Sequence, residues 1–455
     1  MLHAHRCSPW PLAATLLLAA CAVTQVPTPP AVVPAATFKE AGGWQRAAAE
    51  APVPDRWWQL FNDPVLDALE SRLVIGNQSL KSAVAAVASA RAAYEASRSA
   101  LWPSLGANLT ASSNGKSQWA ITSNWETDLW GRLRLASGGA GDSLQASADD
   151  LAAARLSAQA LLAQTYFSLR TAEAQQSLLD RNVVAYQRSL DLTQVRYDGG
   201  VAGRTDVLQA QTQLRSAQAQ RADIQAQRAQ LEHAIAVLLG EAPSAFALAP
   251  AGTEALPAPP AVPQMLPATL LERRPDIAAA QRRVAAAYAQ IGVADAAWFP
   301  DLALTAGGQS RTASLSKVLS APNLAWALGA SLTETVFDNG QRRQASAQAR
   351  ASADQATSSY RQTVLTALQE VEDNLSLAGQ LQQEAQFQAD ALQAAQRTLQ
   401  ITLDQYRAGT ASYLNVVVAQ TAALNSESSL LAVRNRQLAA INLLLKNIAG
   451  RWDPA

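Results

Sequence analysis

The chain has 455 residues, enough for several ordinary domains or for one large repeat architecture. Its formal net charge is zero and only 16% of its residues are charged, which gives no support to nucleic-acid binding. Aromatic residues make up 6%, and alanine inflates the hydrophobic fraction of 49%, a composition that suits long, closely packed helices.

The N-terminus carries a targeting segment. Arg6 precedes an apolar run, Leu12 to Ala20, that is too short to span a bilayer as a permanent helix. The run ends in Leu-Ala-Ala-Cys, which resembles a bacterial lipobox, so residues 1–20 are expected to be cleaved and Cys21 to carry lipid. Ala22 is not the aspartate that retains lipoproteins in the inner membrane, which implies an outer-membrane address. An ordinary signal peptide is the alternative.

The expected mature chain is poor in groups that do chemistry. Lipid would consume Cys21, which leaves no disulfide to form, and His233 and Met265 would be the last histidine and methionine. No cluster of His, Cys and Asp and no phosphate-binding glycine loop occurs. The sequence therefore predicts a protein that is not an enzyme and holds no metal or cofactor apart from its covalent lipid.

Residues 21–65 read as an extended tether, because prolines at its start disfavour regular structure. Asp63-Pro64 predicts a helix start, with an acidic cap followed by proline in the first turn. We expect Trp57 and Trp58 to pin this lead-in segment to the helices that follow.

Residues 66–240 form the first of two structural repeats. A helical pattern runs to about Leu101 and stops at Trp102-Pro103. The region of about 104–130 then alternates apolar with polar residues in two runs, the pattern of a β-hairpin of tilted membrane strands. A pair of soluble β-hairpins is the alternative.

Residues 271–450 repeat the same order, after a Pro/Ala-rich connector at 241–270 and before a short tail at 451–455. A helix is expected from Pro275 to about Phe299, and a second β-hairpin at about 301–337. The two hairpins supply four strands, too few to close a barrel, and an open edge cannot sit in lipid. Several chains must therefore pool their strands, and three chains would supply twelve.

Long helical patterns follow each pair of strands. They are expected at about 144–197 and 206–240 in the first repeat, and at 344–406 and 415–450 in the second. Seam positions spaced by four and three residues indicate coiled-coil packing. Each pair of helices meets at a short turn, near 198–205 and near 407–414, and the two turns share a Tyr-x-x-Gly motif in register. Glycine suits the end of a helix, and Ser, Thr, Asp or Asn beyond it can cap the next one.

These features together resemble the TolC-like outer-membrane efflux proteins, in particular the lipid-anchored NodT/OprM-type branch that serves RND drug pumps. The resemblance covers essentially all of the mature chain. The motifs that carry it are the Leu-Ala-Ala-Cys21 lipobox, Trp57-Trp58 with Phe61-Asn62-Asp63-Pro64, Leu270-Leu271-Glu272-Arg273-Arg274-Pro275-Asp276-Ile277, Trp298-Phe299-Pro300, Trp130-Gly131-Arg132, Phe337-Asp338-Asn339-Gly340-Gln341-Arg342 and the two Tyr-x-x-Gly turns.

The resemblance implies a mainly α fold with membrane β. Three copies would form a homotrimeric twelve-stranded β-barrel, with four strands per chain, continued by a long periplasmic α-helical coiled-coil barrel that is closed at its tip. A periplasmic adaptor and an inner-membrane RND transporter would meet and open that tip. The chain would thus be a passive exit duct in the outer membrane. A duct for type I secretion, or a coiled-coil structural lipoprotein without a pore, is the alternative.

The resemblance also places a periplasmic gate at the tips. The family's tip aspartate and tyrosine match Asp206 and Tyr406, which would form an interchain latch. Where the family tends to place a ring of carboxylates, this chain has Asn415 and Val418, so a constriction by packing replaces a charged ring. The expected gate residues are Thr205, Asp206, Tyr406, Leu414, Asn415 and Val418. Simple interhelix packing is the alternative for Leu414 and Val418.

The tip glycines are the expected points of contact with the adaptor, because backbone without a side chain permits close approach. The residues of this expected contact are Gly200, Val201, Gly409 and Thr410. Helix termination alone is the other reading of the two glycines, and one residue can serve both roles.

Overall fold

The computed structural model describes residues 38–40, 56–111, 117–251, 256–260, 274–312 and 324–448. The expected signal peptide, the lipid-bearing Cys21 and the C-terminal tail lie outside the described residues. The chain divides into two compact units, and each draws on both sequence repeats. The unit that holds the strands contains Ala83–Leu151 and Pro275–Val364, and the other contains Pro34–Ser82, Ala152–Arg274 and Leu365–Ala455.

The lead-in segment is fixed by buried aromatic rings, as expected. A 3-10 turn, η2 (Trp57–Phe61), buries both of its tryptophans, whose rings meet edge to face at 5.8 Å. Helix α2 (Pro64–Gly76) then begins at the predicted position, because Asp63 Oδ1 accepts two backbone N–H groups of its first turn. Asp63 Oδ2 accepts the hydroxyl of Tyr166 at 2.6 Å, which ties this cap to the next long helix.

The helix expected to continue to about Leu101 is instead two helices, α2 and α3 (Gln78–Ser99). They are separated at Asn77, whose Oδ1 accepts the N–H of Leu80 at 3.0 Å and caps α3. The same side chain donates to the carbonyl oxygen of Leu238 at 2.7 Å. Helical periodicity does not reveal this break, because the asparagine is held by a residue distant in sequence.

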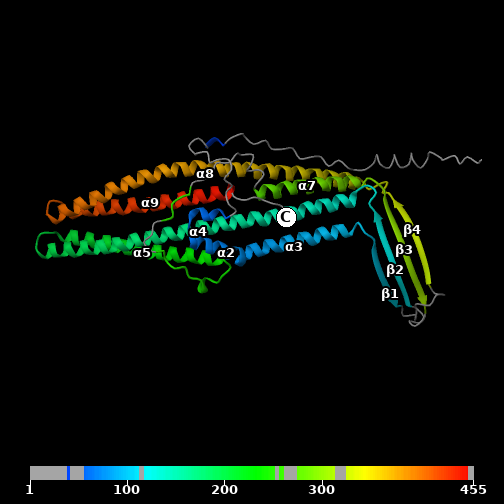
Figure 1. Ribbon diagram of the computed structural model, residues 1–455, viewed down its shortest axis with the longest axis horizontal. Helices are drawn as coiled ribbons and strands as arrows, with labels where there is room; N and C mark the ends of the chain where they lie inside the picture. The colour runs from blue at the N-terminus through cyan, green and yellow to red at the C-terminus, as the bar shows by residue number, and fades with distance from the viewer. Residues whose placement is uncertain are drawn as a thin grey trace, which may run out of the picture. The chain divides into compact units, whose positions relative to one another are not determined.

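Two long helical hairpins follow the strands (Figure 1). In the first repeat α4 (Arg132–Asp198) returns as α5 (Arg204–Leu238), and in the second α8 (Gln341–Arg407) returns as α9 (Tyr413–Ile448). Both outgoing helices have 67 residues, which confirms the duplication seen in the sequence.

Helix α4 begins earlier than the expected position near residue 144. Glycines near its start lower the helix propensity, so the sequence pattern did not indicate a helix there. One of them, Gly139, lies against α7 (Pro275–Ala296), where an added Cβ would come within 3.2 Å of Ala289 Cβ. Likewise, a Cβ on Gly292 of α7 would lie 2.7 Å from Leu135 Cδ1. Small residues therefore serve close packing between these helices.

The strands form one antiparallel sheet in the order β1-β2-β3-β4 (Figure 1). The first hairpin is β1 (Ser104–Ala111) with β2 (Ser117–Thr127), and the second is β3 (Asp301–Thr312) with β4 (Leu324–Thr333). Strand β2 also pairs with β3, and this pairing joins the two hairpins into one sheet. The expectation of four strands per chain is confirmed, and within the described chain β1 and β4 each pair on one side only.

The register sorts the sheet into an apolar and a polar face, because paired residues share a face. Leu105 pairs with Ser123, Leu109 with Trp119, and Leu328 with Ala306. The apolar face carries the large exposed side chains of Leu105, Leu109, Ile121, Trp125, Trp326, Leu328 and Leu332. The opposite face carries small and polar residues that include Asn108, Thr122, Asn124, Thr305 and Gln309. One side thus suits hydrocarbon and the other suits water.

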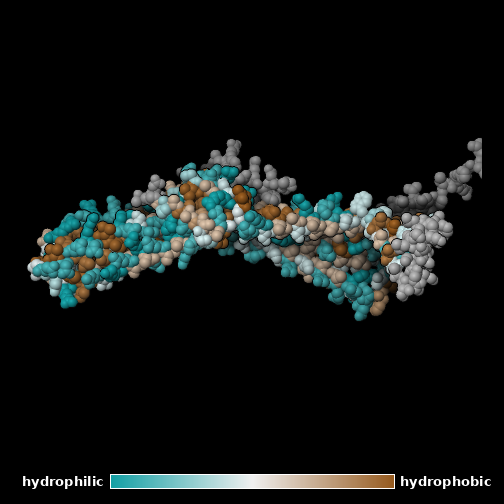
Figure 2. Space-filling view, turned by 90° about the horizontal axis from the view of Figure 1, so that it is seen from below, coloured by the Kyte–Doolittle hydropathy of each residue, from teal (hydrophilic) through white to brown (hydrophobic). Residues whose placement is uncertain are grey.

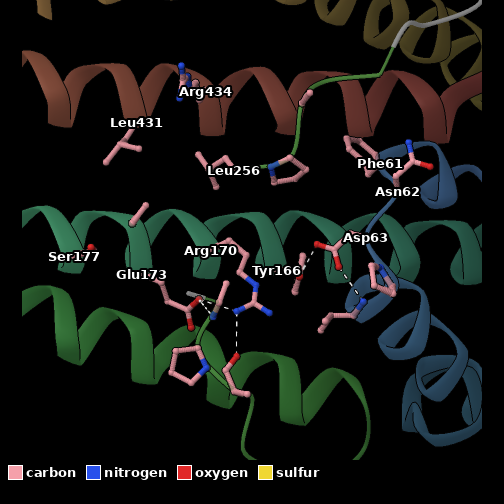
Figure 3. Close-up of a pocket in the computed structure, with 18 of the residues that line it drawn as sticks. Phe61, Asn62, Asp63, Tyr166, Arg170, Glu173, Ser177, Leu256, Leu431 and Arg434 are labelled. Carbon is pink, nitrogen blue, oxygen red and sulfur yellow. Dashed lines mark hydrogen bonds and ion pairs between the residues drawn. The ribbon is translucent and has the colours of Figure 1, made fainter. Parts of the chain in front are cut away.

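The connector starts with a short 3-10 turn, η3 (Pro243–Ala245), and its next residues are held by charged side chains. Glu173 pairs with Arg170 at 2.7 Å and with Arg228 at 3.0 Å, and its carboxylate accepts the N–H of Ala251. Arg170 Nη1 donates to Ala249 O at 3.2 Å. Residues of η2, α4, α9 and the connector line a cavity of about 910 Å³. Arg170 and Glu173 are among its lining residues (Figure 3). These buried charges fasten the connector to α4 and α5.

Candidate gate at the helical tips

Both tip turns adopt the conformation that their glycines allow. Gly200 has φ 72° and Gly409 has φ 80°, in the left-handed region that ends helices. Helix α5 starts after Gly203 without a side-chain cap, so Thr205 and Asp206 lie in its first turn and do not cap it. The expected capping of α5 by a polar side chain is therefore wrong, because the helix begins before those residues.

Tyr406, in the last turn of α8, is buried between the two hairpins with an exposed fraction of 3%. Its hydroxyl lies 3.2 Å from Thr193 Oγ1 on α4. Thr193 donates its own hydroxyl proton to Ser189 O at 2.8 Å, so Tyr406 is the donor in the bond between the two. The ring packs edge to face on Tyr413 at 5.6 Å, in a cluster with Ala210 and other apolar residues.

Arg196, in the last turn of α4, completes this contact. Its guanidinium carbon lies 4.6 Å from the centre of the Tyr406 ring, a cation–π geometry. Its Nη1 donates to the backbone carbonyl oxygen of Tyr406 at 2.5 Å. One arginine therefore holds both the ring and the main chain of Tyr406.

Asp206 lies near Tyr413 at the start of α9. Burial raises the pKa of Tyr413 above its usual range, and the neighbouring Tyr406, Tyr186 and Asp206 raise it further. Within the chain, the hydroxyl of Tyr406 bonds to Thr193 and not to its expected partner Asp206. The latch between Asp206 of one chain and Tyr406 of another stays a prediction.

The remaining gate residues point away from the buried cluster. Leu414 and Val418 are 55% and 61% exposed, and Thr205 and Asn415 are also exposed in the single chain. Hydrophobic side chains gather at the end of the molecule that holds the tips, on the face shown in Figure 2. The exposed apolar residues near the turns include Val195, Val201, Leu208, Ile401, Leu414 and Val418. Such a surface favours burial against another chain.

The residues expected to meet an adaptor lie on the outside of the two turns. A Cβ on Gly200 would find no heavy atom within 4 Å, and Val201 is 69% exposed. Thr410 closes the second turn by donating both its N–H and its hydroxyl to Gln405 O. Gly200 and Gly409 thus terminate helices and are also accessible, which is compatible with both roles expected of them.

Sequence reasoning missed Arg196, Thr193 and Tyr413. A basic residue in the last turn of α4 is a recognisable signal, since cations stabilise helix C-termini. What it could not reveal is that Arg196 reaches across to the end of the other hairpin. The contacts at the tips are hydrogen bonds, one cation–π contact and apolar packing. No group of three or more His, Cys, Asp or Glu able to hold a metal ion occurs within the described ranges.

A family model described as outer membrane efflux protein matches residues 69–241 and 266–450 of the chain. The pyoverdine export outer membrane protein OpmQ of Pseudomonas aeruginosa is 29% identical, with 97% of this chain and 96% of that protein covered. The probable efflux pump outer membrane protein TtgC of Pseudomonas putida is also 29% identical, with 90% and 87% covered.

Solved structures show the same fold. The outer-membrane channel OprN superposes with a TM-score of 0.85 at 29% identity, covering 94% of this chain and 100% of that one. The open state of the MtrE outer membrane channel of Neisseria gonorrhoeae gives 0.79 at 26% identity, covering 94% and 97%.

Proposed function

Because the chain belongs to the outer membrane efflux protein family, we propose that it is the outer-membrane exit duct of a tripartite RND-type efflux pump. Small molecules, including drugs, would pass through it from the periplasm and the inner-membrane pump to the outside. The single observation that carries this proposal is the sheet. Its register gathers large exposed apolar side chains on one face, and its outer strands β1 and β4 each pair on one side only within the described residues.

Such a sheet favours a homotrimer. Within the described residues, strands β1 and β4 each pair with one neighbouring strand only, and in a bilayer every backbone group must be bonded. Pairing β4 of one copy with β1 of the next satisfies both edges and closes a barrel. With three copies, the barrel has twelve strands, an apolar outer face and a polar lumen.

The helical hairpins would continue this barrel into the periplasm. Their tips carry accessible turns at Gly200–Val201 and Gly409–Thr410, the surface that we propose for a periplasmic adaptor. The adaptor would link the duct to an inner-membrane RND transporter, which supplies the energy. Relatives named for pyoverdine export, efflux pumps and toluene efflux support an export role.

The inner surface of the proposed gate would constrict by packing. Leu414 and Val418 lie one turn apart on the same side of α9, and Asn415 directly follows Leu414 in the sequence. All three side chains are exposed, so they are free to meet the equivalent residues of other chains. An apolar ring excludes ions by dewetting and discriminates weakly by charge. We therefore propose a gate that limits passage by size.

Lipid on Cys21 would add a second attachment to the outer membrane. Acyl chains on the N-terminal residue hold the tether to the bilayer independently of the barrel. Phe38 is buried, and the N–H groups of Lys39 and Glu40 donate to the carboxylate of Glu372 on α8 at 2.7 and 2.9 Å. The tether would thus join the membrane anchor to the helical part.

Export in a reconstituted pump tests the proposed function. A host that lacks its own exit duct would express this chain with a matching adaptor and RND transporter, and efflux of a fluorescent pump substrate would be recorded. We expect efflux only when all three components are present. Accumulation equal to the duct-less host, with the protein verified in the outer membrane, would contradict the proposal.

A further inference from the structure

We propose that Trp102 of one chain packs against Phe337 of the next chain, at the place where β1 and β4 of neighbouring copies meet and lead into helices. We call this pair of side chains the seam clasp. The proposal rests on the proposed function, because it needs the homotrimer in which β4 of one copy pairs with β1 of the next. It names the side chains that would complete that contact beyond the ends of the strands.

The junction between the two hairpins inside the chain supplies the template. Trp130 lies three residues after the end of β2, and Phe299 lies two residues before the start of β3. Their rings stack with centroids 5.0 Å apart and an interplanar angle of 22°. Trp130 Nε1 also donates to Pro300 O at 2.7 Å. An aromatic pair therefore closes the β2–β3 junction at the end where the strands lead into helices.

The duplication places corresponding segments at the two edges of the sheet. Trp102 corresponds to Phe299, because each directly precedes a proline and lies two residues before the start of a strand. Phe337 lies four residues after the end of β4, in the segment that leads into α8, as Trp130 lies in the segment that leads into α4. In a ring of copies, β4 and the next β1 repeat the junction of β2 with β3. The template therefore predicts an aromatic pair between chains.

The two side chains of the clasp are open in the single chain. Trp102 is 73% exposed and Phe337 is 84% exposed, and Val336 beside it is 91% exposed. Their counterparts Trp130 and Phe299 are half-buried against each other. Large apolar side chains that are exposed to this degree favour burial by another chain. The repeat symmetry identifies that chain as a second copy.

The faces of the sheet limit the register between copies. Leu105 and Leu332 both lie on the apolar face, and only a register that keeps this face continuous leaves lipid against apolar side chains. Pairing Ser104 of one copy with Thr333 of the next meets this condition, since it sets Leu105 beside Leu332. It also pairs every residue of β1 with a residue of β4.

The same register brings the rings of the clasp to one level. Continued beyond the strand ends, it sets Trp102 across from Thr335, two residues from Phe337. A register that copies the β2–β3 junction sets Trp102 across from Asn339, because Asn339 precedes the turn glycine of its repeat as Trp130 does. Phe337 is again two residues away. Diagonal neighbours at about 7 to 8 Å are within reach of aromatic side chains, so both registers permit the contact.

The clasp cannot form within one chain. Strands β2 and β3 lie between β1 and β4, so the two edges are three strand spacings, or about 14 Å, apart. A disulfide needs Cα atoms within about 7 Å of each other. A cross-link between positions 102 and 337 therefore reports a contact between copies.

Cysteine cross-linking of the full-length protein in outer membranes tests the clasp. The expected mature chain has no free thiol, because Cys7 leaves with the signal peptide and Cys21 carries lipid. After oxidation, the double variant Trp102→Cys/Phe337→Cys is expected to run as covalent dimers and trimers on denaturing gels, and reductant should return it to monomer. Each single variant should stay monomeric.

Trp102→Cys/Trp326→Cys is the matched control. Trp326 is also on β4 and is 80% exposed, but it lies nine residues before Thr335, about 30 Å along the strand. We expect no covalent oligomer from this pair. A cross-link as strong as that of the clasp pair would show that the reaction does not report proximity, and would remove its support for the clasp.

Photo-cross-linking gives a second measurement that keeps an aromatic ring at position 102, should the cysteine variant not assemble. With p-benzoylphenylalanine in place of Trp102, irradiation is expected to join two chains, with the new bond within residues 335–339 by mass spectrometry. Capture of lipid, or of a different segment, would overturn the clasp.

The two possible failures are distinct. A double-cysteine variant that forms heat-resistant trimers and does not cross-link would overturn the clasp and leave the proposed duct in place. Wild-type protein that forms no heat-resistant trimer would contradict the proposed function as well.

Discussion

Gly76 and Gly240 meet backbone to backbone where α2 ends beside the end of α5. A Cβ on Gly240 would lie 2.1 Å from Gly76 O, and a Cβ on Gly76 would lie 1.9 Å from Leu239 O. Gly240 also has φ 73°, a conformation that other residues rarely adopt. Asn77, beside this contact, holds the same helix end through Leu238 O. The break between α2 and α3 is therefore built around two glycines.

Gly76→Ala is expected to destabilise the protein by about 3 kcal/mol or more, because the added methyl must push a backbone carbonyl aside. Denaturant unfolding followed by circular dichroism measures the loss. Gly138→Ala is the control, since a Cβ there meets no heavy atom within 4 Å of the same chain. That variant should gain about 0.5 to 1 kcal/mol from helix propensity. Equal stability of the two variants would show that the contact at Gly76 is loose.

Glu70 makes stability depend on pH. Its side chain is fully buried on α2, and neither carboxyl oxygen has a hydrogen-bond partner in the described part of the chain. Burial, and to a smaller extent the negative charge of Asp67, raises the pKa of Glu70 to about 9. The folded state therefore keeps a proton that the unfolded state loses above pH 4.5. The contribution of Glu70 to the free energy of unfolding is fully present below that pH. It falls by about 1 kcal/mol per pH unit as the pH rises toward 9.

Glu70→Gln is expected to flatten this dependence, because the amide cannot ionise. Melting temperatures between pH 5 and pH 8 provide the measurement. Glu95→Gln, an exposed glutamate on α3, should keep the wild-type slope. A wild-type slope in Glu70→Gln would mean that another group carries the pH dependence.

The two faces of β4 predict opposite responses to a charge. Leu328→Lys places an ammonium on the apolar face and is expected to cost about 2 to 4 kcal/mol if that position lies near the bilayer midplane. Ala327→Lys puts the same charge one residue earlier, on the polar face. Outer-membrane fractions probed for heat-resistant oligomer should show loss of the first variant and retention of the second. Equal loss of both would contradict the assignment of the faces.

Lipid attachment makes a prediction outside the described residues. Cys21→Ser is expected to abolish labelling by radioactive palmitate and to leave the signal peptide uncut at that position. Labelling that persists in Cys21→Ser would show that the lipid is attached to a different residue and that the proposed lipobox is wrong. The mass of the purified wild-type N-terminus gives an independent check.

Local patterns predicted most of the elements. Asp63-Pro64 marked the start of α2, and alternation in the two hairpin regions indicated four strands, because both signals depend on neighbours in sequence. The break at Asn77 and the early start of α4 near Gly139 were missed, because each depends on a partner helix far along the chain. At the tips, Tyr406 was recognised, whereas its partner Arg196 was not. A side chain that bridges two hairpins is visible only after both have folded.

The central claim is that this chain forms a pore, and conductance tests it most directly. Purified full-length protein would be added to planar lipid bilayers at defined voltage and salt. We predict current steps of uniform size, and their size should change in Val418→Asp because that residue lines the proposed constriction. Assembled, heat-resistant protein that inserts into the bilayer and passes no current at any voltage would contradict the account.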